Sequence, residues 1–390
     1  MSLNLDRSTW PRVHLGDVVK DLNETVREPG AVGIDRVIAM EHLDPGELKI
    51  VRWGEIADGT TFTRRVHPGQ TLFGKRRAYQ RKVAFADFDA ICSGDILVFQ
   101  SDPKRLLSQL LPFLVQSEGF FNHALQTSAG SLSPRTNWKD LSRYEFGLPA
   151  LDQQQRIADL LWSVERNRQT STAMALSNQQ ARSAMRDRLF DRESPTAVLQ
   201  SVCSIPSQNG LSKPKDSRAG NVPMVNMGEL FRDEVLRPAD FERVHLEENE
   251  LPKYILRDGD LLFARRSIVF EGAGLCCLVP PLEEPHTFES SIIRVTPKAE
   301  LMCSEYLLHY FRSAVGRRRM GAIIRRGPVS GIAGSDLRKF EVSAPSLETQ
   351  KAIVEQLHHF DQVTPALAES ARAIGELRQG LVNEIFGGAA

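Results

Sequence analysis

Arginine is concentrated in one short stretch of this 390-residue chain. Residues three or four positions apart share a face of a helix, so a helix there would carry a positive ridge. The guanidinium group suits bidentate contacts with phosphate and with guanine edges. The pattern therefore favours a nucleic-acid contact over the alternative of a solvated helix face. Six arginines and no acidic residue lie within fifteen positions: Arg312, Arg317, Arg318, Arg319, Arg325 and Arg326.

A second set of basic residues follows an apolar run in the first half of the chain, with Tyr79 between its members. That run, residues 69–73, resembles residues 259–263, which are also followed by two arginines. Because basic residues follow both runs, we expect a shared nucleic-acid edge rather than a coincidence. The candidates that follow the two runs are Lys75, Arg76, Arg77, Arg81, Lys82, Arg265 and Arg266. Two further candidates, Arg64 and Arg65, lie nearby, before the first run.

Two polar stretches add further candidates. Lys213 and Lys215 stand in a stretch rich in Gly, Ser and Pro, where exposed lysines are common. Residues 131–137 form another polar stretch, which contains Arg135. It either reads bases or merely connects two elements, and both interpretations stay open.

The motifs of catalysis are poorly matched. Residues 69–75 fit the first seven positions of a phosphate-binding loop, but Arg76 replaces the Ser or Thr that would bind magnesium. The chain lacks a Gly-x-Gly-x-x-Gly after a strand and the Asn-Pro-Pro-aromatic tetrapeptide of adenine methyltransferases. The neighbouring His358 and His359 point to different faces of a helix, and the cysteines lack zinc-site spacing. We expect a non-catalytic chain with no metal and no cofactor of its own.

An internal repeat organises these residues. The pattern Pro-x-Leu-x-x-Gln at residues 149–154 returns at residues 345–350, an offset of 196 positions. The apolar runs that begin at Gly69 and Gly259 keep an offset of 190, and loop insertions account for such a change. A duplicated chain is expected to fold as two similar units related by an approximate two-fold.

The composition is that of an ordinary globular protein, with 41% hydrophobic and 25% charged residues. The net charge is zero, so only local charge bears on nucleic-acid binding. Five scattered cysteines indicate buried thiols in a reducing compartment. The N-terminus lacks the apolar core of a signal peptide, and the chain lacks a run of ~18 apolar residues. We expect a cytoplasmic protein without a membrane segment.

The patterns predict two α+β domains, at residues 1–150 and 195–346, separated by helical spacers at residues 151–194 and 347–390. Short β-type runs between Gly, Pro and Asp precede helix-like stretches in each domain. A proline precedes each spacer, and residues 151–190 contain no Gly or Pro. Pro365 follows Thr364 in the second spacer and predicts a break of the helix there.

Apolar residues recur in both spacers at alternating spacings of three and four, which is typical of a coiled-coil seam. One narrow stripe of this length favours an antiparallel pairing of the two helices over packing of each on its own domain. Forty residues of helix span ~60 Å, so the pair would act as a ruler between the domains. The residues expected at this contact, or at a partner, are Ile157, Leu160, Val164, Met174, Met185, Ile353, Leu357, Phe360, Leu367, Ile374, Leu377 and Leu381.

The whole chain resembles the DNA specificity (S) subunits of type I restriction–modification systems. The resemblance rests on two unlike α+β domains that alternate with helices opened by Pro-x-Leu-x-x-Gln. Residues 259–263 resemble the family's Gly-Asp strand entry, whereas Gln70 replaces the Asp in the first half. A Glu usually precedes the Gln of the helix motif, and here Gln153 and Thr349 stand there.

The resemblance implies that each α+β domain is a target recognition domain, which reads one half of an asymmetric, bipartite site on double-stranded DNA. The helices would form an antiparallel coiled coil that fixes the unread gap. The chain would recruit two methyltransferase (M) subunits and restriction (R) subunits. S-adenosylmethionine, ATP and Mg²⁺ would belong to those partners.

Two other classes of function compete with this interpretation. A stand-alone DNA modification enzyme conflicts with the missing motifs. A structural coiled-coil adaptor would leave the arginines at residues 312–326 without a role.

Overall fold

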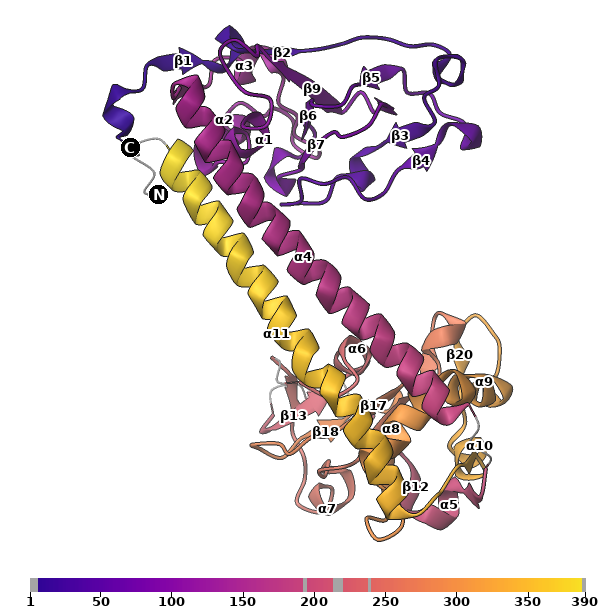
Figure 1. The fold of residues 1–390 in the computed structure, drawn as a ribbon. Helices are drawn as coiled ribbons and strands as arrows, with labels where there is room; N and C mark the ends of the chain where they lie inside the picture. The colour runs from indigo at the N-terminus through magenta and orange to yellow at the C-terminus, as the bar shows by residue number, and fades with distance from the viewer. Residues whose placement is uncertain (1–5, 192–194, 213–219, 238–239, 388–390) are drawn as a thin grey trace. The chain divides into compact units, whose positions relative to one another are not determined.

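The computed structural model describes residues 6–191, 195–212, 220–237 and 240–387. The chain divides into two compact units. The first unit contains Met1–Ala173 and Ala368–Ala390, and the second contains Met174–Leu367. Each unit holds one α+β domain together with segments of two long helices (Figure 1).

The first domain contains two four-stranded sheets. An antiparallel sheet has the order β2-β9-β6-β7, and a mixed sheet has the order β4-β3-β8-β5, in which β3 and β8 are parallel. A separate pair joins β1 to β10. The strands are β1 (Arg12–His14), β2 (Val19–Asp21), β3 (Arg36–Ile38), β4 (Gly54–Glu55), β5 (Arg64–Val66), β6 (Thr71–Gly74), β7 (Val83–Phe85), β8 (Ala90–Cys92), β9 (Ile96–Ser101) and β10 (Glu145–Gly147). The helices are α1 (Leu111–Leu114), α2 (Glu118–Gln126) and α3 (Trp138–Leu141).

The second domain repeats this topology. Its antiparallel sheet has the order β12-β19-β15-β17, its mixed sheet has the order β14-β13-β18, and β11 pairs with β21. The strands are β11 (Ala197–Val198), β12 (Cys203–Asn209), β13 (Val222–Val225), β14 (Glu242–Val244), β15 (Leu261–Ala264), β16 (Arg266–Ser267), β17 (Cys276–Leu278), β18 (Thr287–Phe288), β19 (Ile292–Pro297), β20 (Ser330–Gly331) and β21 (Glu341–Val342). The helices are α5 (Leu199–Val202), α6 (Met227–Arg232), α7 (Leu251–Tyr254), α8 (Ser304–Arg312), α9 (Ala314–Ile323) and α10 (Gly334–Arg338).

The loop insertions expected from the two offsets lie within one segment of the second domain. Strands β6 and β15 begin at Thr71 and Leu261, whereas β9 and β19 begin at Ile96 and Ile292. The offset rises from 190 to 196 between these strands, so the additional residues lie between β15 and β19. This segment contains β16, β17 and β18.

The turn that enters β6 or β15 is built in the same way in both domains. Gly69 and Gly259 have φ of 86° and 80°, in the left-handed region that favours glycine. The next side chain is buried and accepts a hydrogen bond from a backbone N–H three residues earlier. Gln70 Oε1 lies 2.7 Å from the His67 nitrogen, and Asp260 Oδ2 lies 2.8 Å from the Arg257 nitrogen. Gln therefore performs the structural task of Asp in the first domain.

The central antiparallel sheet of each domain is covered on both faces, so its strands carry apolar residues at consecutive positions. In β6, Phe73 packs with the residues of α1 and α2, and Leu72 packs with those of the mixed sheet. In β15, Phe263 and Leu262 divide in the same way. The alternation of side chains along a strand produces these two cores.

The two long helices are α4 (Leu151–Phe190) and α11 (Leu347–Phe386), of 40 residues each. The glutamine of the repeated motif attaches the start of each helix to its domain. Gln154 is buried, donates to the carbonyls of Pro149 (2.9 Å) and Arg105 (2.8 Å), and accepts from the Leu107 nitrogen (2.9 Å). Gln350 makes the equivalent contacts with Pro345, Leu301 and Cys303.

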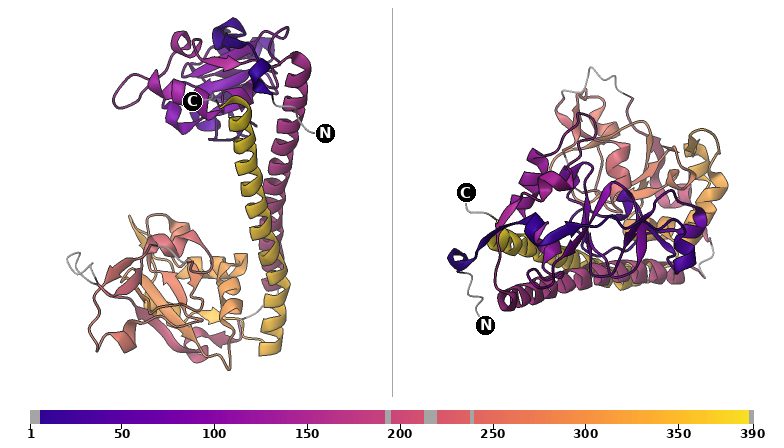
Figure 2. Two further views of the ribbon diagram at one scale, coloured as in Figure 1. Left: turned by 90° about the vertical axis from the view of Figure 1, so that its left-hand side faces the viewer. Right: turned by 90° about the horizontal axis from the view of Figure 1, so that it is seen from above.

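The predicted antiparallel pairing of the helices is confirmed within each unit. In the first unit, Glu165 of α4 forms an ion pair with Arg378 of α11. In the second unit, Arg182 of α4 forms an ion pair with Asp361 of α11 (2.6 Å). The start of one helix therefore meets the end of the other, and Figures 1 and 2 show these segments side by side.

The predicted break at Pro365 is wrong, because α11 continues through this residue. Thr364 does not act as a helix cap; its hydroxyl donates back to the Phe360 carbonyl (3.2 Å). Asn178 of α4 donates to the same carbonyl (3.0 Å) and to the Thr364 hydroxyl (2.7 Å). Polar groups of the partner helix thus support the turn that proline weakens.

The residues expected along the seam lie in three environments: buried in or packed against a core, half-buried, and exposed. Ile157 packs into the core of the first domain, and Ile353 packs into the core of the second. Leu357 is buried, and Leu381 packs against the first core. Met174 and Leu377 are 53% and 56% exposed. The remaining positions are half-buried: Leu160, Val164, Met185, Phe360, Leu367 and Ile374.

Within the described residues, no helix is long and apolar enough to cross a membrane. The same residues contain no group of three or more His, Cys, Asp or Glu side chains arranged to hold a metal ion.

Candidate nucleic-acid interface

The first loop pair consists of residues 75–77, which follow β6, and the hairpin at residues 129–136. The Arg77 nitrogen donates to the Pro134 carbonyl (2.7 Å), and the Thr136 nitrogen donates to the Lys75 carbonyl (3.1 Å). A β-bridge joins Arg76 to Arg135. The fold thus brings the three basic residues 75–77 beside Arg135, which is far from them in the sequence.

The second loop pair occupies the equivalent place in the second domain. It consists of residues 265–269, which follow β15, and the hairpin at residues 325–332. Arg266 pairs with Gly331, and the Ile332 nitrogen donates to the Arg265 carbonyl (3.0 Å). Gly331 is needed at this approach, because a Cβ atom there would lie 2.7 Å from the Arg265 carbonyl oxygen. The two arginines after β15 therefore lie beside Arg325.

The arginines of the first loop pair are engaged within the protein. Arg76 Nε donates to Ser133 Oγ at 2.6 Å. Arg135 Nε donates to Asp95 Oδ1 at 3.1 Å, and Arg76 Nη1 lies 3.7 Å from Asp95 Oδ2. One carboxylate and one hydroxyl thus hold the hairpin against the end of β6.

Arg326 of the second loop pair and Arg317 of α9 also brace these loops. Arg326 stacks on the ring of Phe270, with 4.4 Å between its Cζ and the ring centroid. Arg317 Nη2 donates to the carbonyls of Glu271 (2.7 Å) and Ala273 (3.2 Å), in the segment after β16. Both arginines therefore fix the loop that leaves β16.

Exposed aliphatic side chains lie at the tips of both loop pairs. Leu132 is 91% exposed in the first hairpin, and Ile268 is 87% exposed after β16. Val269 and Val329 are 60% and 54% exposed. Our sequence reasoning missed these residues; the available signal was an isolated aliphatic residue in each polar stretch, Leu132 between two serines and Val329 after Gly-Pro.

A cleft of about 840 Å³ lies beside the first loop pair. Lys75 and Arg135 line it together with the aromatic residues Phe62 and Trp138. Side chains with hydrogen-bonding groups complete the lining, including Asn23, Thr61, Thr63 and Asn137. Such groups suit contacts with base edges and with the sugar–phosphate backbone.

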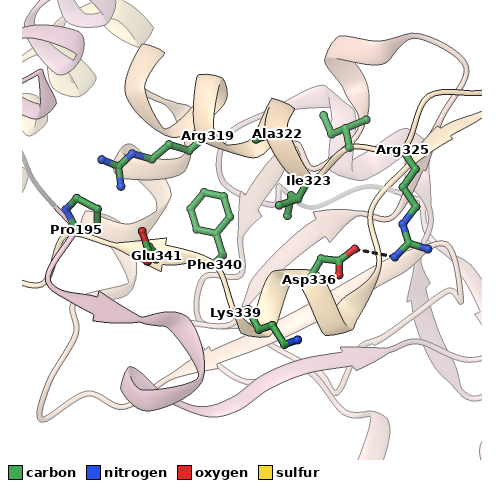
Figure 3. Close-up of a pocket in the computed structure, with 10 residues that line it drawn as sticks. Pro195, Arg319, Ala322, Ile323, Arg325, Asp336, Lys339, Phe340 and Glu341 are labelled. Atoms are coloured by element: carbon green, nitrogen blue, oxygen red, sulfur yellow. Dashed lines mark hydrogen bonds and ion pairs between the residues drawn. The ribbon is translucent and has the colours of Figure 1, made fainter.

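A cleft of about 660 Å³ lies beside the second loop pair (Figure 3). Arg319 of α9 and Lys339 after α10 stand at its edge, and Ile323 and Phe340 provide apolar surface. Arg325 Nη2 binds Asp336 Oδ2 at 2.8 Å, the contact drawn in the figure. Arg318 is exposed on the same helix as Arg319. Of the predicted ridge, Arg318, Arg325 and Arg326 are exposed, whereas Arg319 is half-buried.

Other predicted basic residues of the first domain bind neighbouring groups. Arg64 is buried, forms an ion pair with Asp21 and donates to the Ile96 carbonyl (2.9 Å). Burial raises the pKa of Asp21 even though Arg64 favours its charged form.

Arg65 contacts Asp89 (3.2 Å). Arg81 forms an ion pair with Glu118, and this hydrogen bond lowers the pKa of Glu118. Lys82 Nζ donates to the Met40 carbonyl (2.6 Å).

Arg312, from the predicted ridge, donates to the Cys276 carbonyl (2.7 Å) inside the second domain. Nothing in the sequence around it distinguishes it from the exposed Arg318. The predicted contacts of Lys213 and Lys215 lie outside the described residues.

An ionic cluster fastens the second domain to the long helices. Glu234 binds Arg182 (2.7 Å) and Arg186 (2.6 Å) of α4. Burial alone would raise the pKa of Glu234, but the charges of Arg186 and Arg182 lower it to about 2. His309 is buried nearby, and burial together with Arg182 lowers its pKa to about 3.

The chain matches the family described as "Type I restriction modification DNA specificity domain" over residues 39–178 and 196–373. The EcoKI type I specificity subunit of Escherichia coli (strain K12) is 28% identical over 188 residues, which cover 46% of this chain and 40% of that protein. The MjaVIII type I specificity subunit of Methanocaldococcus jannaschii is 20% identical over 282 residues, which cover 66% of this chain and 65% of that protein. The matched segments therefore cover less than two thirds of each relative.

Solved structures share the fold over the whole length. A chain described under "Structural basis underlying complex assembly and conformational transition of the type I R-M system" superposes with a TM-score of 0.61 and 20% identity, and the match covers 96% of this chain and 97% of that one. The type I restriction–modification S subunit from M. genitalium superposes with a TM-score of 0.55 and 13% identity, over 100% and 99% of the two chains.

Proposed function

Since the chain belongs to the family of type I restriction–modification DNA specificity domains, we propose that it recognises a specific sequence in double-stranded DNA. The observation that carries the proposal is the pair of equivalent loop pairs, each with basic residues and exposed tips. Basic side chains supply contacts with phosphates, and the groups at the loops and clefts are of the kinds that discriminate base edges.

The target of this recognition is bipartite and asymmetric. The two domains have the same topology, so each is suited to one half of a site. Their loops differ: Gly-Ser-Leu-Ser-Pro at residues 130–134 corresponds to Arg-Gly-Pro-Val-Ser at residues 326–330. Because different side chains occupy equivalent places, the two half-sites differ in sequence. Residues 1–150 and 195–346 are the two target recognition domains of this proposal.

The long helices set the unread gap between the half-sites. Residues 151–194 and 347–390 are the spacers of the proposal, and the antiparallel ion pairs in each unit support a fixed register between them. The exposed Met174 and Leu377 leave apolar surface on the helices for partner subunits.

The chain acts as a scaffold rather than as an enzyme. Two methyltransferase subunits would supply S-adenosylmethionine, and restriction subunits would supply the sites for ATP and Mg²⁺. The sequence supports this division, because the motifs of those cofactors are incomplete or missing. A methyl-transfer assay on the isolated chain should show no transfer, and transfer by the chain alone would contradict the scaffold role.

Exchange of one domain tests the bipartite target. Residues 1–150 are replaced by the corresponding domain of a relative, and modified sequences are mapped for the assembled complex. We expect one half-site to change while the other half-site and the gap remain. A change of both half-sites, or of neither, would refute the assignment of one domain to each half.

Two neighbouring arginines of α9, the exposed Arg318 and the half-buried Arg319, test the phosphate contacts. Replacement of Arg318 and Arg319 by alanine should weaken binding to all sequences, and each phosphate that is no longer neutralised should reduce the dependence of log K on log salt by ~1. Arg156, exposed on α4, provides the control. An unchanged salt dependence would remove α9 from the interface.

A further inference from the structure

We propose that the exposed aliphatic side chains at the loop tips make base contacts, and that several neighbouring arginines mainly hold the loops in place. The tip residues are Leu132 in the first domain and Ile268 in the second. The inference rests on the proposed DNA recognition and names the side chains that read the sequence.

The exposure of these side chains is the first argument. Leu132 and Ile268 are 91% and 87% exposed, the largest values among the exposed large hydrophobic residues of the described chain. They add almost nothing to either core, because nearly their whole surface is in contact with solvent. Each lies at the outermost part of its loop pair, where a partner would meet it first.

The engagement of the arginines is the second argument. Arg76 and Arg135 share Asp95, and Arg76 also holds Ser133, the residue after Leu132. In the second domain, Arg317 binds the backbone after β16, and Arg326 stacks on Phe270. A bidentate contact with guanine would require Arg76, Arg135 or Arg317 to leave its hydrogen-bond partners. Stacking on Phe270 orients the guanidinium of Arg326 through its face and does not itself use the N–H groups. In each domain these arginines thus brace the loop that presents the aliphatic tip.

The surroundings of the tips indicate DNA as the occupant. Lys75 and Arg77 accompany Leu132, and Arg265 and Arg266 precede Ile268, so each tip stands among positive charges suited to a polyanion. Aliphatic side chains discriminate bases in the major groove by apolar contact with the thymine methyl group. Serines that can hydrogen-bond to base edges adjoin each tip. They are Ser131 and Ser133 in the first domain and Ser267 in the second.

The test compares Leu132→Ser with Leu125→Ser, a control on α2 that is 40% exposed. Binding sites are selected from DNA with randomised half-sites by the assembled complex, and affinity is measured across a salt series. Leu132→Ser should change the preferred base at one or two adjacent positions of a single half-site, with a roughly tenfold loss of affinity for the original site. The salt dependence should not change, because the basic residues that neutralise phosphates are all retained.

Ile268→Ser should alter the other half-site in the same way, with Leu301→Ser as its control. Thermal unfolding should be unaffected in the two tip variants, since Leu132 and Ile268 are 91% and 87% exposed. The controls at Leu125 and Leu301 remove partly buried leucines away from the tips, so a loss of stability alone should leave the base preference unchanged.

The outcomes separate this inference from the proposed function. Wild-type selection of a bipartite site, with unchanged base preference in both tip variants, would overturn the inference and leave the proposed function intact. A uniform loss of affinity with a smaller salt dependence would also overturn it, because that result indicates phosphate contact. Failure of the wild-type complex to select any sequence would refute the proposed function itself.

Discussion

The ion pair between Glu165 and Arg378 allows a sharp test of how the two long helices are held together. Glu165 is completely buried, yet it accepts hydrogen bonds from Arg168 Nε (3.1 Å) and Gln169 Nε2 (2.7 Å) in addition to Arg378. Burial alone would raise the pKa of Glu165, but the hydrogen bond from Arg168 and the charge of Arg378 lower it overall. The carboxylate is therefore charged in the folded protein and depends on its partners.

Replacement of Arg378 by methionine should destabilise the first unit. Removing one partner from a buried ion pair costs ~3–5 kcal/mol, because the remaining charge loses its compensation. Arg168 and Gln169 still bind Glu165 in this variant, which places the expected loss near the lower limit, at ~3 kcal/mol. Arg378 also donates to the Gly46 carbonyl (2.8 Å), and that hydrogen bond disappears with it.

Simultaneous replacement of Glu165 by leucine and Arg378 by methionine should recover most of this loss. Apolar residues that replace both members of a buried pair are often neutral within ~1 kcal/mol or stabilising. Arg168 keeps a partner in the double variant, because Glu47 remains 2.8 Å from its Nη1. Arg372→Met is the control, since Arg372 and Glu369 are 71% and 75% exposed. Its effect should stay below ~0.5 kcal/mol.

Tryptophan fluorescence during urea unfolding is the assay. All four tryptophans lie in the first unit, at positions 10, 53, 138 and 162, so the signal reports on that unit alone. The reasoning is refuted if Arg378→Met costs less than ~1 kcal/mol, or if the double variant is as unstable as the single one.

Three further predictions concern stability. Gln154→Leu should lower the free energy of urea unfolding by ~3 kcal/mol, because three hydrogen bonds disappear and a buried N–H is left unpaired. The control Gln155→Leu, at an exposed position, should cost under ~0.5 kcal/mol, and equal effects of the two variants would contradict the anchoring role of Gln154. The pKa of His309 is about 3 in the folded protein, compared with the ordinary value of 6.5 expected in the unfolded chain. Its contribution to the free energy of unfolding is therefore fully present above pH 6.5, and it is lost as the pH falls toward 3, because only the unfolded chain binds the proton in that range. Unfolding followed by circular dichroism should therefore lose ~1.4 kcal/mol per pH unit below 6.5, and His309→Gln should flatten this slope; an equal slope in that variant would exclude the histidine. Gly331→Ala should lower the melting temperature, because its Cβ atom would lie 2.7 Å from a backbone oxygen. Gly228→Ala, with open space around it, should raise the melting temperature or leave it unchanged. A melting temperature that is lower for Gly228→Ala than for Gly331→Ala would refute the close approach at Gly331.

The sequence predicted the fold where local chemistry determines it. The prolines at 149 and 345 and the absence of Gly and Pro from residues 151–190 predicted long helices, and these begin at Leu151 and Leu347. Gly69 and Gly259 predicted turns into strands, because only glycine readily adopts the required φ. The change in offset predicted an insertion without placing it.

The sequence did not predict features that depend on groups from distant segments. The helix α11 continues through Pro365, and Asn178, on the other helix, donates to the Phe360 carbonyl in the preceding turn. Arg312 and Arg318 belong to one cluster in the sequence. Arg312 donates a hydrogen bond to a backbone carbonyl of β17, whereas Arg318 remains exposed. Charge density along the chain cannot distinguish a guanidinium that binds a carbonyl from one that faces solvent.

The order of charges along the long helices also selects their mutual direction. Each helix contributes to the ion pairs between the helices one acid from its first half and one arginine from its second half: Glu165 and Arg182 in α4, and Asp361 and Arg378 in α11. A parallel arrangement in the register of the repeat would place acid against acid and arginine against arginine, and like charges at such sites repel. Only the opposed direction places Glu165 against Arg378 and Asp361 against Arg182, so the repeated spacing of these two charges disfavours the parallel arrangement.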